Sequence, residues 1–199
     1  MSCDYNITGH LNQDCVPTAP GYNSGFYIAT WEAFSASVKA SEITWQVSDD
    51  QMTRSLHIGE SVTLKPLYQF ADPRTAVFTG STKAKADSPM SIPYFTKSLQ
   101  LAVDKNATMG EEVGISATSK LLNILSAGRF VLIAERVDGM GFEAFGALSP
   151  LKCTAVDQSL ASDDSNSGMV TVTLETTEGE FAIAVDGTAT SIAKLVAAS

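Results

Sequence analysis

The stretch FVLIAERVDGMGFEAFGAL, residues Phe130–Leu148, decides how this chain folds. It opens with five apolar residues, breaks at Asp138-Gly139, and resumes as a stretch of alternating aromatic residues. Two apolar segments around a short, glycine-bearing connection are the signal of a β-hairpin. The stretch therefore predicts a structural hairpin that belongs to an outer sheet and packs on a helix, rather than a catalytic pocket or a membrane segment.

Apolar and polar side chains alternate in most of the other segments, and this period of two predicts strands. The expected strands are Gly25–Phe34, Glu42–Val47, Ser55–Phe70 in two parts, Thr75–Asp87, Tyr94–Lys105, and a last hairpin, Gly168–Val185, that turns at Thr177–Gly179. Within Tyr94–Lys105 the apolar face holds Leu99, Leu101 and Val103, and the polar face holds Thr96, Ser98 and Gln100. Such a strand fits an antiparallel sheet with water on one side.

A single helix is expected among these strands. In the segment SATSKLLNILSAG, Ser116 is the expected N-cap and Gly128 the expected left-handed end. Its apolar stripe consists of Leu121, Leu122, Ile124 and Leu125. The predicted fold class is mainly β: an antiparallel β-sandwich or barrel with one short packed α-helix and extended loops. Residues 1–24 are expected to form an N-terminal arm, and residues 25–199 a single domain.

The acidic balance of the chain limits its partners. Its 199 residues include 13 basic and 22 acidic side chains, for a net charge of −9. Proteins that grip DNA usually carry a basic stripe, so this composition suits a surface that nucleic acid passes without sticking. The longest apolar run, FVLIA, is far shorter than the about 20 residues of a membrane helix, and no secretory signal opens the chain. We therefore expect a soluble protein made in the cytosol, with no membrane partner.

The sequence contains few side chains of the types that serve in catalysis or bind metals. The three cysteines, Cys3, Cys15 and Cys153, lack the paired spacing of a zinc site and are expected to be free thiols. The two histidines are His10 and His57, and His57 is expected at the surface with no catalytic group beside it. No glycine-rich phosphate-binding motif occurs. The sequence therefore predicts no catalytic residue, no cofactor and no metal, and a protein that is not an enzyme.

The order of the segments resembles one protein family. A polar arm with two cysteines leads into the aromatic strand GYNSGFYIATWEAF, and AVFTGSTKA and YFTKSLQLAVDK follow. The Leu-rich helix, the FVLIAERVDGMGFEAFGAL hairpin and a final VTVTLETTEGEFAIAV complete the pattern. Over roughly residues 20–186 the chain is similar to the tail tube (major tail) proteins of phages and prophages of gut Bacteroidales. It departs from them in lacking Asp-x-x-Gly before the last hairpin.

The resemblance implies a structural virion protein. Tail tube subunits form hexameric rings that stack into a hollow tube, and strands of all six subunits join into one continuous barrel, which removes free sheet edges. The lumen holds the tape measure protein and later conducts the genome into the host, without specific DNA binding. The implied partners are further copies of the chain and the tape measure, terminator and hub proteins. The implied location is the phage tail, after synthesis in the host cytoplasm.

Two sets of residues are expected to serve this assembly. The strand pair Thr75–Asp87 and Tyr94–Lys105 is expected to line the channel, with Thr96, Ser98 and Gln100 facing the lumen. The hairpin turn is expected to make assembly contacts through Asp138, Gly139, Met140 and Gly141. The alternative for the strand pair is an ordinary half-exposed sheet. Two other functions stay open: another ring-forming neck, tail-terminator or tail-tip protein, and a carbohydrate-binding β-sandwich that uses Trp31, Trp45 and Tyr22.

Overall fold

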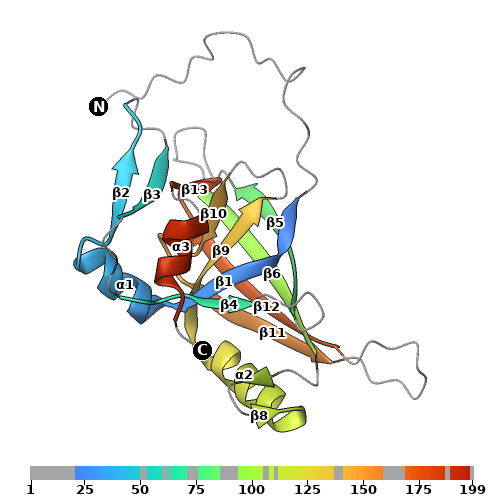
Figure 1. Ribbon diagram of the computed structural model, residues 1–199. Coiled ribbons are helices and arrows are strands. Elements are labelled where there is room, and N and C mark those ends of the chain that lie inside the picture. The colour runs from blue at the N-terminus through green and yellow to red at the C-terminus, as the bar shows by residue number, and fades with distance from the viewer. Residues whose placement is uncertain are drawn as a thin grey trace.

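The computed structural model describes residues 21–49, 53–59, 62, 64–70, 76–85, 94–104, 108–109, 112–136, 141–158, 169–186 and 189–197 (Figure 1). This described part is mainly β, with a large mixed sheet and three helices, where one helix was expected. The strands are β1 (Tyr22–Thr30), β2 (Ile43–Val47), β3 (Arg54–Ile58), β4 (Tyr68–Phe70), β5 (Ala76–Lys85), β6 (Tyr94–Asp104), β7 (Thr108–Met109), β8 (Glu112–Val113), β9 (Arg129–Arg136), β10 (Phe142–Phe145), β11 (Leu151–Gln158), β12 (Met169–Glu178) and β13 (Ile183–Asp186). The helices are α1 (Trp31–Lys39), α2 (Ile115–Ala127) and α3 (Ala189–Leu195).

The strands follow the order β2-β3-β13-β10-β9-β11-β12-β6-β5, and β1 pairs with both β9 and β4. The pairing of β13 with β3 is parallel, so the sheet is mixed rather than wholly antiparallel as expected. The first strand begins at Tyr22, inside the segment 1–24 that was expected to be an arm. Residues 1–20 of that arm lie outside the described part of the chain.

The stretch Phe130–Leu148 forms the predicted hairpin, but in the centre of the molecule rather than in an outer sheet. Strands β9 and β10 pair antiparallel, with Phe142 opposite Glu135. Residues 130–134 of β9 are all buried, because apolar clusters cover both of its faces. Phe130 and Leu132 belong to one cluster, with β6, β12 and Leu125 of α2, and alternate residues belong to the other, with α1, α3, β2, β3 and β13. A strand buried on both faces reads as a continuous apolar run, as FVLIA does.

The prediction of a last hairpin was wrong. Strand β12 pairs with β11 and β6, whereas β13 pairs with β10 and β3. The turn expected at Thr177–Gly179 is instead a crossing from one part of the sheet to another. Its middle residue, Glu178, is buried inside the protein, so the chain cannot reverse there as an exposed turn would. The two alternating segments, β12 and β13, therefore pair with different strands although they are neighbours in the sequence.

The expected strand Gly25–Phe34 is also corrected, because α1 begins at Trp31. Thr30 caps this helix: its Oγ1 accepts a hydrogen bond from the amide of Ala33 at 3.3 Å. Glu32 in the first turn and Lys39 in the last turn suit the helix dipole. Two of the aromatic residues that indicated a strand, Trp31 and Phe34, instead pack from the helix onto the second apolar cluster, in which Phe34 is 2 % exposed.

Helix α2 lies where it was predicted, with different ends. Its N-cap is Gly114, without a side-chain hydrogen bond, rather than Ser116. Gly128 ends it in an extended conformation (φ −88°) rather than a left-handed one. Glycine is nevertheless required there, because a Cβ would lie 2.3 Å from the Phe130 ring and 2.9 Å from the Ile124 carbonyl oxygen. Leu125 is buried in the core, whereas Ile124, which was predicted to belong to the apolar stripe, is 41 % exposed.

Candidate assembly surface

The three predicted lumen residues lie together on one face of β6. Gln100 is exposed, and Thr96 and Ser98 are half-buried. The opposite face of β6 holds Leu99, Leu101 and Val103, each 1 % exposed, in the first apolar cluster. The predicted division of this strand into a polar and an apolar face is therefore confirmed.

Neighbouring strands extend this polar face. Strand β6 runs between β5 and β12 and pairs antiparallel with each of them over ten residues. Ser98 lies opposite Ser81 and Glu175, and Gln100 lies opposite Thr173. The described polar residues of β11, β12, β6 and β5 that share this face include Lys152, Asp157, Thr171, Thr173, Glu175, Thr177, Thr96, Ser98, Gln100, Asp104, Ser81 and Lys83. Among the described side chains it carries two lysines and three carboxylates (Asp104 included), so the surface offers hydroxyl and amide groups without concentrated positive charge.

Strand β5 ends the sheet with a long edge. It pairs with β6 along its ten residues, and no described strand forms a ladder with its other side. Its backbone fits closely on β6, because a Cβ at Gly80 would lie 2.7 Å from Leu99 Cδ2. Strand β1 also packs against β5. An edge of this length presents a row of backbone donors and acceptors that another strand can pair with.

The predicted turn contacts are described only in part. Asp138, Gly139 and Met140 lie outside the described residues, and only Gly141 is placed. Its carbonyl oxygen accepts a hydrogen bond from the Arg136 amide at 3.0 Å, which closes the hairpin between β9 and β10. The role of the turn in assembly stays a prediction.

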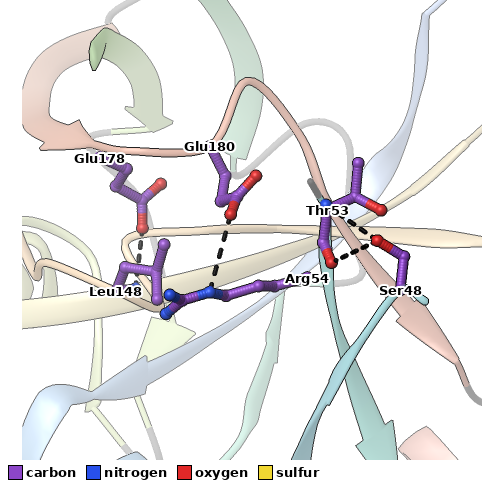
Figure 2. Close-up of polar contacts among 6 residues, drawn as sticks. All are labelled: Ser48, Thr53, Arg54, Leu148, Glu178 and Glu180. Carbon is purple, nitrogen blue, oxygen red and sulfur yellow. Dashed lines mark hydrogen bonds and ion pairs between the residues drawn. The ribbon is translucent and has the colours of Figure 1, made fainter. Parts of the chain in front are cut away.

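A buried ion pair lies on the other face of β6, and the sequence analysis did not identify it. Lys97 Nζ lies 2.8 Å from Glu178 Oε2, and both side chains have zero exposure. Glu178 Oε1 accepts a hydrogen bond from the Leu148 amide at 2.9 Å, as Figure 2 shows. Lys97 Nζ also lies 5.5 Å from the centre of the Phe145 ring. The alternation of faces along the strand could have revealed the buried lysine, because it places Lys97 on the same face as Leu99.

A second carboxylate, that of Glu180, lies near this pair. Burial raises its pKa, while the positive charges of Arg54 and Lys97 act in the opposite direction and the charge of Glu178 adds to the rise. Arg54 Nε approaches Glu180 Oε1 at 3.7 Å (Figure 2). Arg54 also lines a surface cavity of about 550 Å³ with Val47, Ser48 and Asp49.

The two tryptophans come from neighbouring elements of the chain and line the same cavity. Trp31 from α1 and Trp45 from β2 line one cavity of about 290 Å³. The remaining lining residues are Phe34, Ser35, Val38, Lys39, Ala147 and Leu148. Tyr22, the third aromatic residue considered for a binding platform, is not among them; its hydroxyl donates to Glu143, and burial together with that contact raises its pKa.

His57 was expected to have no catalytic group beside it, but an aspartate lies next to it. Its Nδ1 lies 2.9 Å from Asp186 Oδ2, because the parallel pairing of β13 with β3 places the two residues side by side. Both side chains are exposed, at 42 % and 64 %. Cys153 is a free thiol, as predicted, and Cys3 and Cys15 lie outside the described residues.

Comparison with known proteins identifies no relative: no family model, curated protein or solved structure matches this chain. Among the residues that the structure describes, no group of three or more histidine, cysteine or acidic side chains is arranged to hold a metal ion. In the same part of the chain, no helix is long and apolar enough to span a membrane.

Proposed function

We propose that this protein is a structural tail tube subunit of a phage, of the type found in phages and prophages of gut Bacteroidales. Its subunits form hexameric rings that stack into a tube, and the lumen conducts the genome into the host. The observation that carries the proposal is the geometry of β11-β12-β6-β5. This segment has one sealed apolar face and one polar face, and it ends in a ten-residue strand whose outer edge pairs with no described strand.

Pairing across subunits gives the edge of β5 a function. Six copies of the four-stranded segment, each joined through β5 to the next subunit, close a ring of strands without a free edge. The core faces of β6 and β12 then point into the subunit, as the burial of Leu101 and Leu174 requires. The face that carries Thr96, Ser98 and Gln100 points into the channel.

The fold of the subunit fits the same proposal. Strands β1, β9, β11, β12, β6 and β5 all contribute to the first apolar cluster or flank it, and β1 packs back against β5. Leu125 of α2 enters the same cluster. In this proposal the six strands curve into an incomplete β-barrel that stays open along the outer edge of β5, with α2 over one end and the remaining strands as a second layer with α1 and α3.

The charge of the chain suits a channel that releases DNA. A hexamer carries a charge of about −54, six times −9, and such a field repels DNA wherever it faces the lumen. Among the described side chains, the polar face itself holds two lysines, three carboxylates and no basic stripe. Like-charged subunits also make ring stacking sensitive to salt, because the repulsion must be screened. The tape measure, terminator and hub proteins are the proposed partners of the tube.

Electron microscopy of the purified protein at low and high salt and rising concentration tests the proposal. Six-fold rings and striated hollow tubes are the expected result, and a monomer at every condition contradicts it. Hydrogen exchange then tests the edge. Amides along the outer side of β5 should exchange fast in the monomer and slowly in the tube, while those of β12, which is paired on both sides, serve as the internal control. Equal exchange of β5 in both states excludes closure through this strand.

The same experiment separates the tail tube from a neck, tail-terminator or tail-tip protein. Those components form single rings, whereas a tube subunit polymerises. Rings that never stack therefore favour the second assignment.

A carbohydrate-binding module is the second class of function, and one observation favours it. Trp31 and Trp45 line a shared cavity, and aromatic faces in a concave site suit sugar rings. Tyr22 takes no part in this cavity. Binding on a glycan array that Trp45→Ala abolishes, together with a monomeric state in solution, would favour the module over the tube.

A further inference from the structure

The strongest unexplained feature of the molecule is the pair Lys97–Glu178. The two residues come from neighbouring strands, β6 and β12, and meet at 2.8 Å with no exposure of either side chain. Apart from this contact, Lys97 Nζ and Glu178 Oε2 have no hydrogen-bond partner among the described residues. An ammonium group has three protons to donate, so a single contact leaves it poorly satisfied. Ions buried in this way keep a large desolvation cost.

We propose that Lys97 and Glu178 condense after folding into an isopeptide bond between Nζ and Cδ, which the protein forms on itself. The product is a neutral amide in place of two buried charges. Removing the charges removes their desolvation cost, and the water that is released passes to bulk solvent. The folded protein thus favours a condensation that free side chains in water do not undergo, and it holds the reacting groups in contact beforehand.

The step balances without any further reactant. A proton first passes from the Lys97 ammonium to Glu178 Oε2, which leaves a neutral amine and a carboxylic acid. The nitrogen lone pair then attacks Cδ, and the C=O electrons move onto Oε1. The Cδ–Oε2 bond breaks, and Oε2 departs as water with two of the three protons that Nζ carried. The third proton stays on the amide nitrogen.

The surroundings supply what this step requires. The Leu148 amide, at 2.9 Å from Glu178 Oε1, stabilises the negative charge that forms on that oxygen. The Phe145 ring covers the amine, which helps to keep water away from the pair.

The test is the intact mass of the folded full-length protein. The proposal requires a mass lower by one water molecule than the sequence predicts, and no such loss in protein kept denatured from the start. Trypsin must then yield peptide 86–105, uncleaved at Lys97, joined to peptide 153–194. Lys97→Met should abolish the loss, whereas Lys83→Met, which removes an exposed lysine of β5, should retain it.

Two results overturn the proposal. One is a folded wild-type protein of unreduced mass after prolonged incubation at neutral pH, which needs no variant and is independent of whether tubes form. The other is a water loss that maps elsewhere, for example to a succinimide at Asp138-Gly139 or Asp186-Gly187. In either case trypsin releases the separate peptides 86–97 and 98–105 in quantitative yield.

Discussion

Gln100→Lys should convert a channel that releases DNA into one that retains it. Gln100 is exposed on the polar face of β6, opposite Thr173 of β12 and Thr79 of β5, so no carboxylate stands directly across from the new lysine. Ser98, by contrast, lies opposite Glu175. A lysine at Ser98 would be partly neutralised by this cross-strand neighbour. The effect of Gln100→Lys should therefore exceed that of Ser98→Lys.

The size of the effect follows from the six-fold ring. Six added charges change the hexamer from about −54 to about −48 (six times −8), but all six stand around one ring of the lumen. Each phosphate contact contributes about −0.9 to the slope of log affinity against log salt, so six contacts give a slope of about −5. A fourfold rise in salt should then weaken DNA retention about a thousandfold.

The assay is DNA retention by purified tubes across a salt series, with ejection from variant phage as the biological measurement. Thr44→Lys on β2 adds the same charge at an exposed position away from the polar face and should behave as wild type. Thermal unfolding of the free subunit should be unchanged in both variants, because both positions are exposed. Normal ejection and no salt-dependent retention by Gln100→Lys tubes would show that this face does not line the channel.

Three further predictions concern the subunit itself. Leu101→Ala should lower the free energy of unfolding by about 3 kcal/mol in urea titrations, because the side chain is 1 % exposed and leaves a cavity; a loss below 1 kcal/mol would contradict its place in the core. Gly128→Ala should cost about 1–3 kcal/mol by crowding the Phe130 ring, and the smaller cost of an ordinary helix-end substitution would argue against that close approach. The hydrogen bond from Arg129 lowers the pKa of Glu32, so its small contribution to stability should be complete above the usual glutamate pKa and disappear as the pH falls through the lowered value. Arg129→Met should flatten this part of the stability–pH curve, and an unchanged curve would exclude the linkage.

Much of the local structure could be predicted from the residues in order. The alternation in Tyr94–Lys105 established which side chains of β6 are buried, because successive residues of a strand point to opposite faces whatever its neighbours are. The hairpin of β9 and β10 was predictable for a related reason: its two strands are joined by a short connection and pair with each other. Helix α2 was found from its leucine spacing; its expected N-cap was wrong, and Gly128 does end the helix but in an extended rather than a left-handed conformation.

Partners and layers were decided by the tertiary structure. The segments β12 and β13 look like a hairpin, yet β12 pairs with β6 and β11, and β13 pairs with β10 and β3. The helix α1 likewise replaced an aromatic strand because its apolar face packs on a cluster assembled from distant segments. Lys97 and Glu178 form an ion pair although they are 81 positions apart in the sequence (178 minus 97). No local sequence pattern connects residues at that separation. A period of two determines which face of a strand a residue occupies, but only packing across the whole chain determines which residue meets it there.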